Sequence, residues 1–144
     1  MPEDPPQNLP KQYSDWFLEM LVKIANSGDS MGITLQVGGF LVSGTLVGGA
    51  EYFEGFAKDF ASTFKPEHAE TMRQAVAEAA EPYKTARAVD LDLPAEFIHL
   101  KNVQFFSHAG SPVSSRGVWW RGRVCEVSGF ILGSLSAPGE RLPR

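Results

Sequence analysis

The sequence predicts an α+β domain built on a small, curved, antiparallel five-stranded sheet, or on a small barrel made from the same strands. Three observations lead to this prediction. Apolar residues recur at helical spacing in three segments, and strand-like apolar or alternating runs occupy five others. Glycines also lie inside the strand-like runs, where they permit the bends or bulges that a strongly curved sheet requires.

The first predicted element is a helix over residues 12–26, because apolar side chains there recur at helical spacing. This apolar face consists of Trp16, Phe17, Met20, Leu21 and Ile24. We expect the face to pack on the sheet, and the alternative is that it binds a partner protein. Asn26 and the following Ser27 and Gly28 provide a stop signal for the helix.

Two further helices are predicted between the second and third strands. One begins at Ala50 and is rich in phenylalanine at helical spacing up to Phe64. The other begins at Pro66, where proline fits the first helical turn, and Pro82 should kink or end it. This second helix has a small, alanine-rich face that allows close packing but buries little apolar area.

The strands are predicted in two groups. Residues 32–49 form a hairpin that turns at Gly38 and Gly39, with a bend or bulge at Gly44. Phe97–Ser107 is the third strand, and Val118–Cys125 and Phe130–Leu135 form a second hairpin. A helix followed by five curved strands is the order of the Sm-like barrel, a likeness of fold that carries no function by itself.

Composition favours one cytosolic domain over residues 12–136, flanked by a disordered tail at 1–11 and a flexible tail at 137–144. The chain has 144 residues, 43% of them apolar, and one cysteine, which cannot form an internal disulfide. The acidic, proline-rich N-terminus lacks the basic start and apolar middle of a signal peptide. No apolar run is long enough to span a bilayer, so we expect no membrane partner.

Charge is divided unevenly along the chain, whose formal net charge is −4. Residues 1–96 carry fifteen acidic and seven basic side chains, whereas residues 97–144 carry two acidic and six basic ones. The two halves either complement each other inside one fold or favour self-association. An acidic chain does not favour non-specific binding of nucleic acid.

No catalytic or metal-binding constellation is predicted, and no cofactor. The three histidines, His68, His99 and His108, fall on a helix, a strand and a loop, without the spacing of paired ligands. Cys125 fits a small buried residue better than a nucleophile, because the sequence places no histidine beside it. If the protein were an enzyme, His99 and Glu126 would be the groups to test first.

The unusual local feature is the run of two tryptophans and two arginines at residues 119–123. Arginine beside tryptophan can stack on bases or bind carboxylates, so the strand could bind single-stranded nucleic acid. We favour the alternative in which a tryptophan fills the core and the arginines pair with acids of a neighbouring subunit. The candidate interaction residues are Lys101, Phe106, Trp119, Arg121 and Arg123.

Three segments together resemble the gas-vesicle accessory protein GvpU family. They are ITLQVGGFLVSGTLVGGAEYFEGF, FIHLKNVQFF and VWWRGRVCEVSGFILGSLS. The resemblance implies a cytosolic, non-enzymatic accessory protein that self-associates and contacts the vesicle shell or other accessory proteins. It implies no catalytic residues and no cofactor. The alternative function is an Sm-like RNA-binding module with a basic groove around Lys101, Arg121 and Arg123.

Self-association should use a sheet edge, because an edge strand offers unpaired backbone groups to a second copy. The sequence offers two candidate edges, Phe97–Ser107 and Phe130–Leu135. We therefore predict a homo-oligomer joined through one of these strands.

Overall fold

The computed structural model describes residues 14–107, 109 and 117–135, and it contains three α-helices and five strands. The elements in chain order are α1 (Trp16–Asn26), β1 (Met31–Val37), β2 (Phe40–Val47), α2 (Gly49–Ala61), α3 (Pro66–Ala77), the 3-10 turns η1 (Glu78–Lys84) and η2 (Ala86–Val89), β3 (Phe97–Ser107), β4 (Val118–Arg123), the 3-10 turn η3 (Val124–Glu126) and β5 (Gly129–Leu132). The predicted tails at 1–11 and 137–144, and most of the loop at 108–116, lie outside the described residues.

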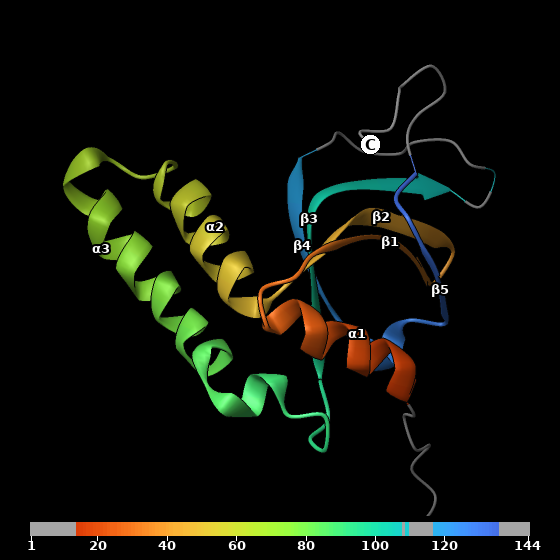
Figure 1. The fold of residues 1–144 in the computed structure, drawn as a ribbon. Helices are drawn as coiled ribbons and strands as arrows, with labels where there is room; N and C mark the ends of the chain where they lie inside the picture. The colour runs from red at the N-terminus through yellow and green to blue at the C-terminus, as the bar shows by residue number, and fades with distance from the viewer. Residues whose placement is uncertain (1–13, 108, 110–116, 136–144) are drawn as a thin grey trace, which may run out of the picture.

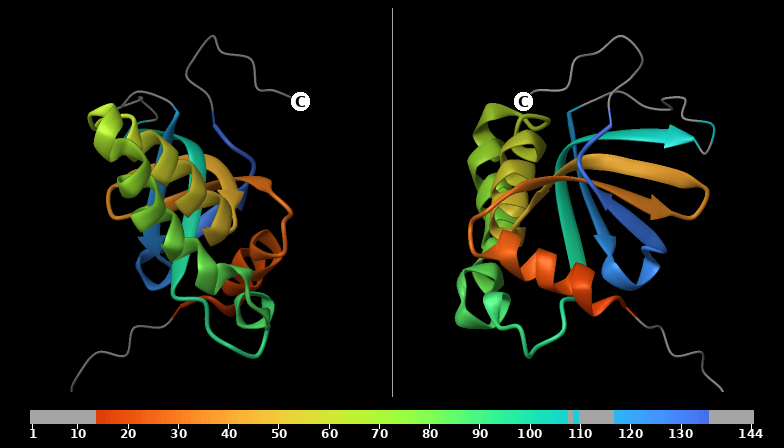
Figure 2. Two further views of the ribbon diagram at one scale, coloured as in Figure 1. Left: turned by 90° about the vertical axis from the view of Figure 1, so that its left-hand side faces the viewer. Right: turned by 45° about the vertical axis from the view of Figure 1, so that its right-hand side comes forward.

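The sheet is open and antiparallel, with strand order β4-β3-β2-β1-β5 (Figures 1 and 2). The α+β class and the curved five-stranded sheet are thereby confirmed, and the barrel alternative is wrong because the edge strands β4 and β5 do not pair. The predicted hairpin between them is also wrong. After β4 the chain turns through η3 and crosses to the opposite edge, where β5 pairs with β1.

Strand β3 contains a bulge that the regular two-residue alternation could not foresee. Ser43 pairs with Gln104 and Thr45 with Lys101, so one residue of β2 faces two residues of β3. Asn102 lies at this point with a φ of 53°, in the left-handed region that asparagine tolerates. A Cβ on the facing residue, Gly44, would lie 2.7 Å from the Lys101 carbonyl oxygen, so the predicted bend at Gly44 accommodates the bulge.

The bulge corrects the predicted faces of β3 beyond residue 102. Val103 and Phe105 pack with the core that contains Ile98, whereas a strict two-residue alternation along Phe97–Ser107 would place both on the face of His99. The extra residue at the bulge shifts the alternation by one position, so the two faces exchange residues there.

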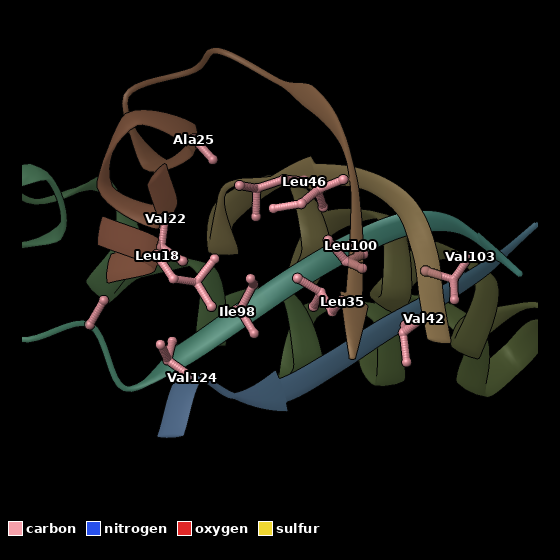
Figure 3. Packing of buried hydrophobic residues seen from close by; sticks show 12 residues of the cluster. Leu18, Val22, Ala25, Leu35, Val42, Leu46, Ile98, Leu100, Val103 and Val124 are labelled. Carbon is pink, nitrogen blue, oxygen red and sulfur yellow. The ribbon is translucent and has the colours of Figure 1, made fainter. Parts of the chain in front are cut away.

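The core lies between α1 and the inner face of the curved sheet (Figure 3). Leu18 and Val22 of α1 point toward Ile98 and the neighbouring strands. The buried side chains of this cluster are Leu18, Val22, Ala25, Ile33, Leu35, Val42, Leu46, Ala95, Ile98, Leu100, Val103 and Val124.

Helix α1 differs from its prediction in both its start and its buried face. It begins at Trp16 because the Asp15 side chain caps it, accepting a hydrogen bond from the Phe17 N–H. Leu18 and Val22 are buried, while Trp16 and Phe17 are exposed. Apolar residues surround most of this helix, so spacing alone could not select the side that faces the sheet.

Helices α2 and α3 lie side by side on the other side of the sheet, with α2 next to the strands (Figures 1 and 2). Helix α3 buries no residue, in keeping with its outer position. It ends at Ala77, and Pro82 lies in the 3-10 turn that follows, because proline cannot continue an α-helical hydrogen-bond ladder. Among the described residues, no helix combines the length and the apolar character needed to cross a bilayer.

Candidate interaction site

Trp119 and Lys101 of the sheet both contact the same side of helix α2. Residues 51, 55 and 59 recur every four positions, so they lie along one side of the helix. The Lys101 Nζ lies 2.8 Å from the Glu51 Oε2, and the Trp119 Nε1 donates to the Asp59 Oδ2 at 3.0 Å. Both candidate residues therefore hold α2 against the sheet within one chain.

Gly55 has no side chain, and this leaves room for the Trp119 ring against α2, between positions 51 and 59. A Cβ at position 55 would overlap the indole ring, so only glycine permits this approach of helix and ring. The Tyr52 ring meets the indole edge to face, with 6.0 Å between the ring centroids. Trp120 points to the opposite face and packs against the core, as the sequence predicted for one tryptophan of the pair.

Arg121 is held by two aromatic rings and a histidine. Its guanidinium lies over the Phe97 ring at 3.7 Å from the centroid, with the Phe53 ring 5.3 Å away. Its Nε donates to the Nε2 of His99, the residue that pairs with it across β3 and β4, at 3.2 Å. Among the described residues, no carboxylate forms a salt bridge with Arg121.

His99 is the buried centre of this arrangement and is only 1% exposed. The rings of Tyr52, Phe53 and Tyr83 surround its imidazole at centroid distances of 4.7, 5.8 and 5.2 Å. Burial, and secondarily the charge of Arg121, lowers the pKa of His99 from 6.5 to about 3. The neutral ring accepts the Arg121 hydrogen bond through Nε2, and its Nδ1 has no hydrogen-bond partner within the part of the chain that the structure describes.

This environment makes His99 a positioning group for Arg121 and a poor general base. Its basic nitrogen is occupied, and its conjugate acid would form only in strong acid. Burial also raises the pKa of the neighbouring Tyr52, an effect that the charge of Arg121 opposes. Glu126, the other catalytic candidate, lies exposed in η3. Among the described residues, no cluster of histidine, cysteine or acidic side chains could hold a metal ion.

The remaining two candidate residues lie apart from this cluster. Phe106 is 2% exposed, so its side chain serves the interior and not a surface. Arg123 is exposed at the end of β4, and its pairing with a neighbouring subunit stays a prediction. Glu51 pairs with Lys101, so a groove around residues 101, 121 and 123 would contain a carboxylate as well as the cations that the RNA-binding alternative requires.

The free edge at β5 carries an apolar surface, which we call the β5 surface and define as Trp16, Phe17, Ile131 and Leu132. Trp16, Ile131 and Leu132 are 73%, 58% and 72% exposed. Phe17 meets Phe130 edge to face at a centroid distance of 5.7 Å, which joins the start of α1 to β5. Sequence reasoning indicated the strand edge but assigned the two aromatic residues of α1 to the core.

Two strands were expected to offer a free edge for self-association, and the prediction is wrong for Phe97–Ser107, which is β3. Strand β3 pairs with β2 on one side and β4 on the other, so it offers no free edge. Among the described strands, β5 pairs only with β1 and therefore lies at an edge, although it ends at Leu132 and not at Leu135. The chain then turns at Gly133, and the Leu135 N–H donates to the Ser43 hydroxyl at 2.6 Å.

Comparison with known proteins yields one family. The family model described as "Gas vesicle protein GvpU-like" matches residues 15–135, which is most of the chain. No curated protein matches the chain, and no solved structure matches it.

Proposed function

Because the chain belongs to the GvpU-like family of gas vesicle proteins, we propose that it is a non-enzymatic accessory protein that associates with itself and with gas-vesicle components. The components are the vesicle shell or other accessory proteins. Such contacts would influence the assembly or the clustering of vesicles. The work would take place in the cytoplasm, at or near the vesicles.

The observation that carries the self-association proposal is the β5 surface. An edge strand presents backbone donors and acceptors without partners, and proteins that remain monomeric usually cover or charge such edges. Here the edge lies beside exposed tryptophan, phenylalanine, isoleucine and leucine side chains. Exposed aromatic and aliphatic groups beside an open edge are typical of an interface between protein chains.

A two-fold axis next to β5 would use this surface in both copies. Antiparallel strands can pair with a copy of themselves, so the β5 strands of two chains can extend the sheet. Strand β5 has four residues, which gives few backbone hydrogen bonds. Burial of the neighbouring apolar side chains, Trp16 and Leu132 above all, would then supply most of the stabilisation.

Light-scattering mass measurements over a concentration series test this proposal. We expect the wild-type protein to exceed the monomer mass, and Ile131→Lys to weaken association by about tenfold or more, since a lysine would be buried without a partner. Val118→Lys is the matched control, because Val118 is an exposed apolar residue on β4 at the opposite edge. A monomeric wild type, or equal effects of the two variants, would refute association through the β5 surface.

Vesicle binding needs a separate measurement. Gas vesicles rise in a centrifugal field, so bound protein is recovered in the buoyant layer and unbound protein is not. We expect wild-type protein in that layer at low and moderate salt. Protein that stays in solution with purified vesicles under both conditions would contradict the proposed contact with vesicles, whatever its oligomeric state.

A further inference from the structure

A hollow of about 590 Å³ lies between α1, α2, the turns η1 and η2, the strand β3 with the residues before it, and the strand β4. Its volume is within the range of sites that hold small organic ligands. Three aromatic rings, Phe53, Tyr83 and Phe97, line it together with Arg121. The hollow contains no residue of the β5 surface, so ligand binding there is independent of self-association.

Cations prevail around this hollow although the chain as a whole is acidic. Lys23, Arg87 and Arg121 line it, and Glu96 is the one carboxylate among the described lining residues. None of the three cations has a salt bridge to a described carboxylate, Glu96 included. Three cations elsewhere, Arg73, Lys84 and Lys101, are each paired with glutamate, and Lys58, Lys65 and Arg123, which have no salt bridge to a described carboxylate, are exposed to solvent.

Lys23 is the most informative of the three cations. It is 5% exposed, and its Nζ donates to the Arg87 carbonyl oxygen at 3.1 Å. A buried ammonium group is costly without a nearby negative charge, and one carbonyl satisfies only one of its three donors. A negatively charged group in the adjoining hollow would satisfy both requirements.

Arg121 is prepared to receive such a group. The Phe97 ring supports the plane of its guanidinium, and His99 takes the hydrogen bond of its Nε. These contacts hold the side chain in place, and among the described residues no carboxylate pairs with its guanidinium, so the terminal NH₂ groups can donate to a ligand. A planar pair of N–H donors matches the two oxygens of a carboxylate, and a fixed side chain loses little entropy on binding.

We propose that this hollow binds a carboxylate joined to an apolar, preferably aromatic, group. Arg121 holds the carboxylate oxygens, Lys23 and Arg87 supply further positive charge, and the aromatic rings pack against the apolar part. The carboxylate can come from a free organic acid or from an acidic side chain of a peptide. His99 acts through Arg121 as a positioning residue.

Titration of ¹⁵N-labelled protein, followed by NMR, tests the proposal. The probes are benzoate, its uncharged analogue benzamide, and a Phe-Glu dipeptide blocked at both ends. We expect benzoate to shift the backbone amides of Lys23, Arg87 and Phe97 in a saturable way, with a dissociation constant of about 1 mM. Benzamide should have no saturable effect. Tighter binding of the dipeptide than of benzoate would identify a peptide carboxylate, and the reverse would identify a free acid.

Variants assign the effect to the hollow. Arg121→Met should weaken benzoate binding at least tenfold, and Arg121→Lys should weaken it less because charge remains while the planar donor pair is lost. Arg123→Met is the matched control, an exposed arginine of the same strand outside the hollow, and should bind as the wild type does. If Arg121→Met does not fold, Lys23→Met serves, since methionine fits a buried position. Absent saturation, equal binding of benzamide, or an equal loss in Arg123→Met would overturn the proposal.

Discussion

The two faces of the sheet differ in chemistry although adjacent residues of the same strands build them. On β3, Ile98 and Leu100 enter the apolar core under α1, whereas His99 and Lys101 between and beside them face α2. The inner face is closed by non-directional packing of aliphatic side chains. The outer face is organised by hydrogen bonds, ring contacts and ion pairs, each between particular partners.

This difference separates the part that stabilises the fold from the part that positions functional groups. Aliphatic burial contributes in proportion to the area removed from water, so the inner face should dominate stability. Polar contacts near the surface contribute little net free energy but fix geometry. Truncating a core side chain of the inner face should therefore cost the most stability, whereas removing a single polar contact of the outer face should alter specific properties at a small cost in stability.

The largest effect is expected for Leu100→Ala on the inner face. Leu100 is fully buried in the core, so its truncation should leave a cavity and lower the free energy of unfolding by about 3 kcal/mol. Leu91→Ala is the control, because Leu91 is 66% exposed and lies outside the β5 surface, so its truncation should change stability by less than about 0.5 kcal/mol. Chemical denaturation of both variants measures this. Equal losses would remove the distinction between core and surface leucines.

The second-largest loss of stability is expected for Gly55→Ala on the outer face. Alanine normally stabilises a helix interior relative to glycine by about 1 kcal/mol. Here the new Cβ would overlap the Trp119 ring, so we expect a loss of about 2 kcal/mol instead. Denaturation curves of the single and double variants provide the measurement.

The same substitution in a Trp119→Ala background is its control. With the ring removed, Gly55→Ala should become stabilising by about 1 kcal/mol. A loss that persists without the indole would show that the conflict lies elsewhere in α2, and the fit between Gly55 and Trp119 would lose its importance.

The third prediction concerns pH and His99. The folded-state pKa of His99, about 3, is below the ordinary 6.5, so the unfolded chain binds the proton more readily. The contribution of the neutral, buried His99 to the free energy of unfolding is therefore complete above pH 6.5, and it decreases as the pH falls toward 3. Between pH 6.5 and 5, where carboxylates titrate little, the free energy of unfolding should fall by about 1.5 kcal/mol.

Denaturation across this pH range checks the effect in His99→Gln, which removes the titrating group. The variant should lose this pH dependence, while His68→Gln, a change at an exposed histidine of α3, should retain it. Equal pH profiles of the wild type and His99→Gln would mean that His99 is not the group responsible.

The sequence could predict the element order and the sheet because alternation and glycine positions are local signals. It could not predict that β4 and β5 separate to opposite edges, since strand pairing depends on contacts between distant residues. The sequence also could not predict the bulge at Asn102, and therefore not the faces of β3 on which Val103 and Phe106 lie. One extra residue in a strand reverses every later position, and nothing in the alternation marks it.

The candidate site was predicted in composition but not in arrangement. The sequence points to the arginine and tryptophan run as unusual, and in the structure Trp119 and Arg121 lie in one cluster around Tyr52 and Phe53. Their partners, His99 above all, come from other elements that only the tertiary fold brings together. The hollow beside Arg121 has the same origin, since six segments of the chain contribute to it.

The smallest effect is expected for the ion pair between Lys101 and Glu51. Its side chains are 34% and 48% exposed, so water and salt screen the attraction. A double-mutant cycle with Lys101→Met and Glu51→Gln should give a coupling energy of no more than about 0.5 kcal/mol, and about 1 M NaCl should remove it. A coupling several times larger would mean that the outer face also stabilises the fold through its charges, and the contrast between the two faces would then fail. A small coupling would leave the pair a role in orienting α2 over Trp119 and Arg121, which is the role that the geometry of the helix favours.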